Sequence, residues 1–364
     1  MNERLYQLRG LFEKYERRIS SIFLVGGFIF DSLTIQRIDR PFDHLVILSY
    51  LMLSGASIIL LNKYHERPPI SNFSIWVRNL LLPFIQFALG GLFSVFLVFY
   101  SRSTSISASW PFLLLLLFLL VGNEFFRNYY ERLTFQLSIY YIAIFSFSIL
   151  IVPVLLKKMN AGVFLLSGLV SLVFITFFTR ILFRMVPQLY HQSRVDINRM
   201  ITLLFLVINI LYFTNLIPPI PLAMKNSGIY HLVTKMDNNY EVVGEKRDWY
   251  GWLPSLSPLT VHLNEGEPLY AFGAVFAPTG LNTDVIHDWQ YFDKAADKWV
   301  SATKVTFNIF GGRGEGYRTF SKKENLFYGQ WRVDVKTESG QIIGRLRFNI
   351  VPVSSKPMLY EKIL

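Results

Sequence analysis

The sequence predicts an α-helical polytopic membrane bundle followed by a C-terminal all-β domain. Apolar stretches of about 20 residues, the length that crosses a hydrocarbon core of roughly 30 Å, recur through the first part of the chain. Beyond Lys225 apolar and polar residues alternate instead, which is typical of β-strands with one buried face. This change in the pattern of apolar residues divides the chain into a membrane region and a β-rich region.

Seven apolar stretches are long enough to be transmembrane helices. They cover residues 19–35, 42–62, 78–100, 107–123, 136–156, 161–183 and 199–219. These stretches make residues 19–220 a transmembrane domain that contacts the lipid bilayer. Before it, residues 1–18 place Leu5 and Phe12 on one helical face and basic residues elsewhere, which favours a helix lying in the cytoplasmic interface. A solvated extension of the first span is the alternative.

The basic residues between these spans are unevenly distributed, and their distribution predicts the orientation. When connections are assigned to alternate sides, fourteen lysines and arginines fall on one side and five on the other. Connections rich in Lys and Arg stay in the cytoplasm. We therefore expect the N-terminus in the cytoplasm. Because the number of spans is odd, we expect the C-terminal domain to be exported to the other side of the membrane.

Charge and cysteine content exclude several classes of function. The chain has 36 lysines and arginines against 25 acidic residues, but residues 226–364 hold 16 basic and 15 acidic residues. The excess positive charge therefore lies in the membrane connections, and nucleic acid is not an expected partner. Because the chain contains no cysteine, disulfides, thiol catalysis and cysteine-bound metals are excluded.

Few polar residues fall within the predicted spans. The candidates for an intramembrane role are Asp31, Gln86, Glu124 and Asn209. Ionisable groups in the membrane are costly and mark functional sites, but Gln and Asn also join helices through hydrogen bonds. The second interpretation makes the bundle an anchor or scaffold.

The β-rich region begins after a stiff connector. Three closely spaced prolines follow the last span and cannot continue a helix, so we expect residues 221–228 to form a linker. Residues 229–353 then form the predicted β domain, and residues 354–364 a C-terminal tail.

Strands are predicted from the alternation of apolar and polar residues. Six expected strands cover residues 229–235, 239–247, 268–277, 284–293, 299–310 and 315–322. In the next strand Trp331 and Val333 face one way while Arg332, Asp334 and Lys336 face the other. A tight hairpin at residues 338–340 joins it to the last strand. The strand at 268–277 is apolar on both faces and should be central.

This strand pattern favours one type of β fold. Several short strands with little helix, in a domain of this size, favour an immunoglobulin-like antiparallel sandwich. A small barrel is the alternative. Neither fold identifies a function, because both host many.

Three sequence blocks in the β domain resemble a known family. They are His287-Asp288-Trp289, Tyr317-Arg318-Thr319-Phe320-Ser321-Lys322, and Gly329-Gln330-Trp331-Arg332-Val333-Asp334-Val335 with Gly340. Within residues 245–352 their order and spacing are similar to the framework of the bacterial domain-of-unknown-function 2914 family. The family often has tryptophan where Phe320 stands. The resemblance implies a domain at the C-terminus of a membrane protein and brings no established activity.

Two of these blocks predict a ligand-binding site. The candidate residues are His287, Trp289, Arg318, Ser321 and Lys322. An aromatic platform beside cationic donors suits a sugar, a peptide or an anionic group. The alternative is structural, with buried tryptophans, solvated cationic side chains and a histidine that caps a turn.

Signals for enzymatic chemistry are absent from the sequence. His231, His262 and His287 lack the spacing of metal ligands. The glycine-rich stretch at residues 311–316 lacks the Lys-Ser/Thr ending and the following helix of a phosphate loop. We therefore expect no catalytic residue, no metal and no cofactor.

The expected function is binding. These observations predict an inner-membrane protein whose bundle anchors a periplasmic domain that binds an envelope component, either a protein, a glycan or a peptidoglycan-related ligand. One alternative is a membrane enzyme or transporter for a lipid-linked or small polar substrate, with the β domain as a regulatory lid. A second is a periplasmic sensor that signals to a separate cytoplasmic partner. The sequence specifies neither the ligand nor the oligomeric state.

Overall fold

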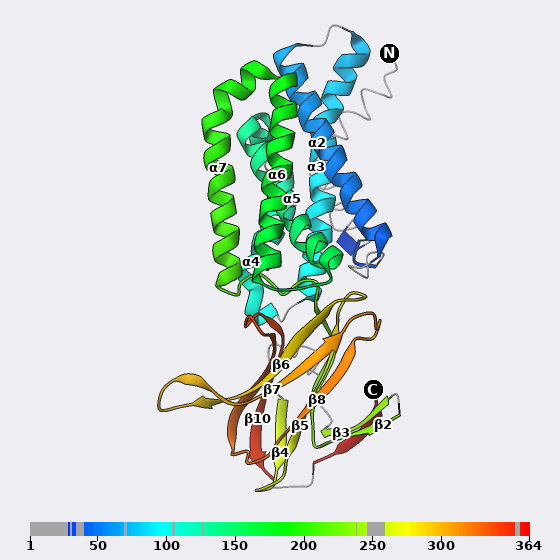
Figure 1. The fold of residues 1–364 in the computed structure, drawn as a ribbon, viewed down its shortest axis with the longest axis vertical. Coiled ribbons are helices and arrows are strands. Elements are labelled where there is room, and N and C mark those ends of the chain that lie inside the picture. Colours follow the sequence, from blue (N-terminus) through cyan, green and yellow to red (C-terminus); the bar gives the residue numbers. More distant parts are fainter. Residues whose placement is uncertain are drawn as a thin grey trace, which may run out of the picture. The chain divides into compact units, whose positions relative to one another are not determined.

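The computed structural model describes most of the chain (Figure 1). The described residues are 28–29, 31–33, 40–68, 71–103, 106–125, 127–237, 239–245, 259–353 and 357–364. They form two compact units, one made of helices and one that contains all the described β-strands. The expected cytoplasmic segment at residues 1–18 and most of the first expected span at 19–35 lie outside the described residues.

Long apolar helices make up the described part of the membrane region (Figure 1). They are α2 (Pro41–Glu66), α3 (Asn72–Arg102), α4 (Ile106–Phe125), α5 (Leu133–Leu156), α6 (Ala161–Met185) and α7 (Pro187–Phe213), with the 3-10 helix η1 (Arg127–Glu131) before α5. By length and composition five of them, all except α4, can cross a membrane, and α4 has a shorter apolar part at Ser109–Asn123. The chain therefore has the helices of a multi-pass membrane protein.

The last helix differs most from its expected span. α7 begins at Pro187 and ends at Phe213, whereas hydropathy placed the span at residues 199–219. Proline is favoured at the first position of a helix. The early turns of α7 carry Arg194 and Asp196, and hydropathy detects apolar composition, so it missed this polar half of the helix.

A small residue allows two helices of the helical unit to approach closely. A Cβ added at Gly55 of α2 would lie 2.6 Å from the hydroxyl oxygen of Tyr140 on α5. That hydroxyl donates a hydrogen bond to the carbonyl oxygen of Leu51 at 3.1 Å. Such contacts matter in lipid, where no hydrophobic force drives helices together.

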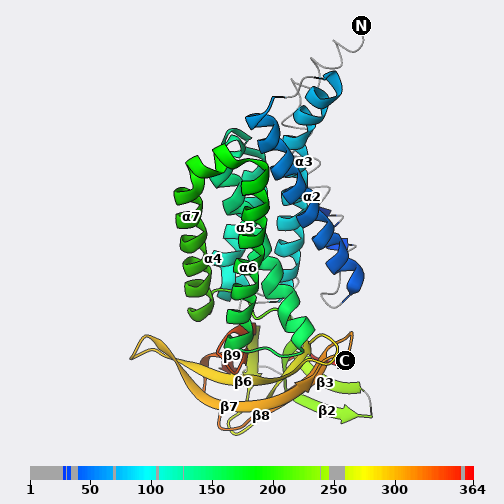
Figure 2. The ribbon, with the colours of Figure 1, turned by 45° about the horizontal axis from the view of Figure 1, so that its top comes forward.

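Eleven β-strands form three sheets among the described residues (Figures 1 and 2). They are β1 (Ala223–Tyr230), β2 (Leu232–Met236), β3 (Asn239–Glu245), β4 (Leu259–Leu263), β5 (Leu269–Phe276), β6 (Asn282–Asp293), β7 (Lys298–Phe310), β8 (Tyr317–Lys323), β9 (Gly329–Thr337), β10 (Ile342–Pro352) and β11 (Leu359–Ile363). The strand orders are β1-β5-β8, β4-β10-β9-β6-β7 and β11-β3-β2. All pairs are antiparallel except β10 with β4, which is parallel.

Most of the expected strands are present. β5 lies between β1 and β8, as its two apolar faces predicted. The expected hairpin joins β9 to β10, and there Gly340 adopts a φ of 89° while its N–H donates to the Thr337 carbonyl oxygen at 3.0 Å. This left-handed conformation favours glycine.

Strand structure also occurs where none was expected. β1 begins at Ala223, within the range expected to be a linker, and pairs with β5. β11 lies in the range expected to be a tail and pairs with β3, and β4 was not expected at all. These strands are held by partners distant in the sequence, so local patterns do not specify their pairing.

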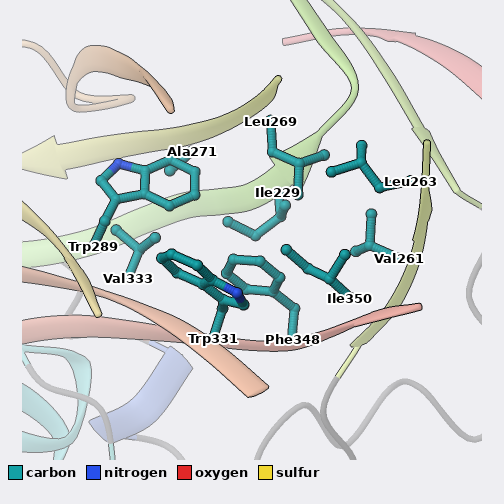
Figure 3. Close-up of a cluster of buried hydrophobic side chains, with 10 residues drawn as sticks. All are labelled: Ile229, Val261, Leu263, Leu269, Ala271, Trp289, Trp331, Val333, Phe348 and Ile350. Carbon is teal, nitrogen blue, oxygen red and sulfur yellow. The ribbon is translucent and has the colours of Figure 1, made fainter. Parts of the chain in front are cut away.

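A hydrophobic cluster joins two of the sheets (Figure 3). Its members, each at most 6% exposed, are Ile229, Val261, Leu263, Leu269, Ala271, Trp289, Trp331, Val333, Phe348 and Ile350. They come from β1 and β5 of one sheet and from β4, β6, β9 and β10 of another. Burial of each large apolar side chain stabilises the fold by about 1.5–3 kcal/mol. The cluster therefore fixes which face of β6, β9 and β10 points inward.

Candidate functional site

His287, Trp289 and Ser321 meet inside the β domain. They come from β6 and β8, and each is at most 3% exposed. The Ser321 hydroxyl accepts a hydrogen bond from Trp289 Nε1 at 2.9 Å, and its oxygen lies 3.0 Å from His287 Nδ1. His287 Nε2 lies 3.2 Å from the Thr319 hydroxyl oxygen. These buried polar groups therefore satisfy one another away from solvent.

Arg318 and Lys322 lie on the other face of β8. Side chains alternate along a strand, so these two point away from the buried Thr319 and Ser321. Lys322 is exposed and forms an ion pair with Glu324 at 2.5 Å. The structure thus divides the five candidate residues between the interior of the domain and the opposite face of β8.

Burial determines the charge of His287. Removal from water lowers the pKa of its imidazole to about 4, because the charged form loses hydration. The ring also packs against Phe307, with 4.8 Å between the ring centroids. His287 is therefore neutral at physiological pH and belongs to the packed interior.

Three of the four polar candidates in the membrane region are Asp31, Asn209 and Glu124. Asp31 Oδ2 accepts a hydrogen bond from the Ser94 hydroxyl at 2.5 Å. Asn209 Nδ2 donates to the Phe205 carbonyl oxygen of its own helix at 2.7 Å. Glu124 lies in α4, and its side chain is outside the described part of the structure.

The fourth candidate, Gln86, belongs to a buried chain of hydrogen bonds. Gln86 Nε2 donates to the carbonyl oxygen of Asn123 at 3.1 Å, and Asn123 accepts from the Tyr130 hydroxyl. Gln136 Nε2 donates to the Tyr130 carbonyl oxygen at 2.5 Å, and Gln136 Oε1 accepts from Asn62 Nδ2 at 2.6 Å. These hydrogen bonds link α2, α3, α4, η1 and α5. Sequence analysis missed Asn62 and Gln136, although each is a polar residue in an apolar stretch.

Charged and polar residues gather on the outward face of the five-stranded sheet, most of them in two cross-strand rows. The opposite side chains of β6, β9 and β10 point into the cluster of Figure 3. We call this surface the charged face, and its members are Asp288, Gln290, Ser301, Lys304, Arg332, Asp334, Lys336, Arg345 and Arg347. Five of these residues are cations and two are carboxylates, so the face carries excess positive charge.

The two carboxylates of the charged face are buried and paired. Asp288 Oδ2 accepts from Lys336 Nζ at 2.7 Å, and Asp288 Oδ1 accepts from the Ser301 hydroxyl at 2.5 Å. Burial raises the pKa of Asp288, but these hydrogen bonds outweigh it and hold the pKa below its ordinary value. Asp334 accepts two hydrogen bonds from Arg345, at 2.6 and 2.7 Å. Lys336 and Arg345 are thus already neutralised within the sheet.

Arg332 has a different environment. It lies directly opposite Arg347 in the pairing of β9 with β10. Its Nε donates to Gln290 Oε1, a neutral acceptor, at 2.8 Å and lies 3.8 Å from Asp334 Oδ2. Its guanidinium stacks over the Trp299 ring, 4.4 Å from the centroid. Contacts on two sides therefore fix the orientation of this cation.

The positive charge beside Arg332 is only partly compensated. Burial, together with the charges of Arg345 and Arg347, lowers the pKa of Arg332 to about 10, and the carboxylate of Asp334 offsets this only in part. Like charges directly opposite each other across two strands destabilise a sheet. The charges around Arg332 are therefore mixed, because Asp334 and Asp288 raise its pKa while Arg345 and Arg347 lower it.

Sequence analysis placed Arg332, Asp334 and Lys336 on one face of a strand but did not name them as site residues. The alternation in β9 predicts that face. The cross-strand partners Asp288 and Arg347 follow only from the register, which no local pattern contains. A run of alternating charges beside buried aromatic residues was the available signal.

Two histidines share one carboxylate elsewhere in the domain. Glu245 Oε1 lies 2.9 Å from His231 Nε2, and Glu245 Oε2 lies 2.8 Å from His262 Nδ1. Across the ranges that the structure describes, no group of three metal-binding side chains could hold an ion. The contacts fasten the end of β3 to β4 and to the residue between β1 and β2.

The helices and sheets together define a multi-pass membrane protein with a C-terminal β-rich domain. Residues 282–350 match the family model described as "Protein of unknown function (DUF2914)". This match confirms the resemblance found in the sequence, over a shorter range than 245–352. The matched region runs from β6 into β10 and contains all nine members of the charged face.

Other comparisons add little. No curated protein matches the chain. Among solved structures, the chain is similar to the Pseudomonas fluorescens alkylpurine DNA glycosylase AlkC bound to DNA containing an abasic site analog, with 11% identity, 86% of this chain and 99% of that chain covered, and a TM-score of 0.20. A likeness with so low a TM-score carries no argument about fold or function.

Proposed function

We propose that this protein is a bacterial inner-membrane protein whose helical bundle anchors a periplasmic domain that binds an envelope component. The excess of Lys and Arg in alternate connections supports a cytoplasmic N-terminus. Two sheets joined by one hydrophobic cluster support an immunoglobulin-like sandwich for the exported domain. The envelope component is a protein, a glycan or a peptidoglycan-related ligand.

The charged face is the observation that carries the proposal. Its carboxylates are engaged by Lys336 and Arg345, and Arg332 shares Asp334, whose Oδ2 lies 3.8 Å from its Nε. The direct cross-strand partner of Arg332 is another cation, Arg347. Such an arrangement lowers the stability of the sheet. Binding of a negatively charged group would remove the repulsion, so the face is suited to recognition of a partner.

The contacts inside the bundle support the role of an anchor. Gln86 and Asn209 bond to backbone carbonyl groups, as interhelical or intrahelical partners do. A transporter needs polar groups available to its substrate at depth in the membrane. The hydrogen-bond chain from α2 to α5 instead connects helices to one another.

Crosslinking tests this proposal. Tagged full-length protein, recovered from crosslinked membranes, is expected to bring an envelope component with it, and Arg347→Gln is expected to reduce that recovery. Arg313→Gln is the matched control, because it removes one exposed arginine from the loop before β8, where it stacks over Tyr317. Recovery of the protein alone under several crosslinking chemistries would contradict the proposal.

A further inference from the structure

We infer that one face of the small sheet β11-β3-β2 binds a basic amphipathic helix of another protein. The inference goes beyond the proposed function, because it assigns the β domain a second binding surface that shares no residue with the charged face. None of its residues was a candidate from the sequence. All of them lie outside residues 282–350, the range that matches the family model.

The two faces of the small sheet have different environments (Figure 1). Val233 of β2 and Val242 of β3 pack against Phe272 and Ala274 of β5, so one face is buried within the domain. Side chains alternate along a strand, and the register of β3 with β2 and β11 therefore assigns every second residue to the opposite face. We call this surface the outer face, and its members are Leu232, Thr234, Met236, Asn239, Glu241, Val243, Glu245, Leu359, Glu361 and Ile363.

Large apolar side chains gather on the outer face. Leu232 and Met236 on β2 and Leu359 and Ile363 on β11 are each 47–67% exposed. Single exposed apolar residues are ordinary, but several on one face mark an interaction site. In folded domains an apolar sheet face is buried against a helix or another sheet. The outer face therefore suits a partner that supplies such a layer.

The charges of the outer face are all negative. It carries Glu241, Glu245 and Glu361 and no lysine or arginine. Glu245 is engaged by His231 and His262. Neither Glu241 nor Glu361 forms an ion pair with a described residue. The face is thus apolar and acidic, and charge complementarity favours a partner that is apolar and basic.

The same charges disfavour two other occupants. In a two-fold contact between copies of this chain the outer face would meet itself, so that carboxylates would oppose carboxylates. A membrane surface is negatively charged where it carries anionic lipid. Glu241 and Glu361 would repel such a surface.

The dimensions of the outer face suit one helix and a weak complex. An α-helix with its side chains is about 10–12 Å across, and two strand spacings of about 4.8 Å separate β2 from β11. One helix lying along β3 can therefore contact apolar side chains of both outer strands. β2 and β11 have 5 residues each, so the face is small beside a standard interface of about 800 Å² per partner. We expect a complex that dissociates readily and leaves free copies of the protein.

Site-directed photo-crosslinking in living cells tests the inference. The photoreactive amino acid p-benzoylphenylalanine is placed at Thr234, an exposed member of the outer face, in the full-length protein. Irradiation is expected to join it to another protein, and mass spectrometry identifies the crosslinked segment. We expect apolar residues at helical spacing and more Lys and Arg than Asp and Glu in that segment. The same probe at the exposed Thr306 of β7 is expected not to give this product.

Two substitutions test which properties of the outer face matter. Ile363→Asp removes apolar contact and Glu361→Lys reverses a charge, and each is expected to lower the crosslinking yield at Thr234 by at least about fivefold. Lys362→Glu is the matched control on the opposite face of the same strand, and its yield is expected to stay within about twofold. All three residues are exposed, so the variants are expected to unfold at the same denaturant concentration as the unchanged protein.

Four results would overturn the inference. They are the absence of any crosslinked protein at Thr234, a product only with lipid or with this chain itself, a crosslinked segment that is not basic, and an unchanged yield in both Ile363→Asp and Glu361→Lys. None of these results concerns the charged face. Recovery of an envelope component that depends on Arg347 would therefore leave the proposed function standing.

Discussion

Replacing Asp334 with alanine is expected to lower the free energy of unfolding of the β domain by about 3–5 kcal/mol, as removal of one partner from a buried ion pair does. Asp334 is 3% exposed and accepts both hydrogen bonds of the Arg345 guanidinium. Without the carboxylate, Arg345 would remain buried and charged beside Arg332. The loss therefore combines an unpaired charge with repulsion between neighbouring cations.

The unfolding free energy is measured by denaturant titration of the full-length protein. Hydrogen exchange in peptides from β9 and β10 reports the unfolding of the β domain at each denaturant concentration. Asp284→Ala is the matched control on the same strand system, because Asp284 accepts an exposed hydrogen bond from Asn308 Nδ2 at 2.7 Å. The control is expected to cost less than about 1 kcal/mol. A loss in Asp334→Ala no larger than that of the control would show that the buried pair does not stabilise the sheet.

Acidification is expected to destabilise the β domain through His287. The pKa of His287 is about 4 in the folded protein and about 6.5 in an unfolded chain. Above pH 6.5 this residue is neutral in both states and adds no pH dependence. Below it the unfolded state binds a proton that the folded state excludes, so the unfolding free energy falls by about 1.4 kcal/mol per pH unit. The total loss reaches about 3 kcal/mol near pH 4.

The measurement is the unfolding free energy between pH 6.5 and pH 5, where most carboxylates stay ionised. We expect the unchanged protein to lose about 2 kcal/mol over this range through His287, and His287→Gln to lack this contribution. His262→Gln should retain it, because His262 bonds to Glu245 with a side chain that is 30% exposed. An identical pH dependence in the unchanged protein and in His287→Gln would contradict a buried neutral imidazole.

The sequence was sufficient to predict strands where burial of one or both faces produces a regular pattern of apolar residues. Alternation predicted β9 and the hairpin at Gly340, and two apolar faces predicted that β5 is central. It was insufficient where structure depends on distant partners. β11 is held by β3, and no feature of residues 359–363 names that partner. β4 has apolar Leu259, Val261 and Leu263 in alternation, so its own signal was present and overlooked.

The candidate site was likewise predictable where local sequence is sufficient and unpredictable where it depends on distant strands. Sequence blocks brought His287, Trp289 and Ser321 to attention, and the structure joins these three in one hydrogen-bonded cluster. The blocks could not specify which of these side chains are buried. Alternation assigns residues to two faces of a strand, but it does not indicate which face a second sheet covers. The opposition of Arg332 and Arg347 depends on the register of β9 with β10, which is fixed by packing of the whole domain.

The central claim is that the domain bearing the charged face is exported, and cysteine labelling tests it most directly. The chain contains no cysteine, so single substitutions at exposed positions give unambiguous labels. A membrane-impermeant maleimide applied to intact spheroplasts is expected to label Glu361→Cys in β11, and to label Arg67→Cys, beyond the end of α2, only after lysis. Labelling of Glu361→Cys only after lysis would place the domain in the cytoplasm and contradict the proposed envelope role.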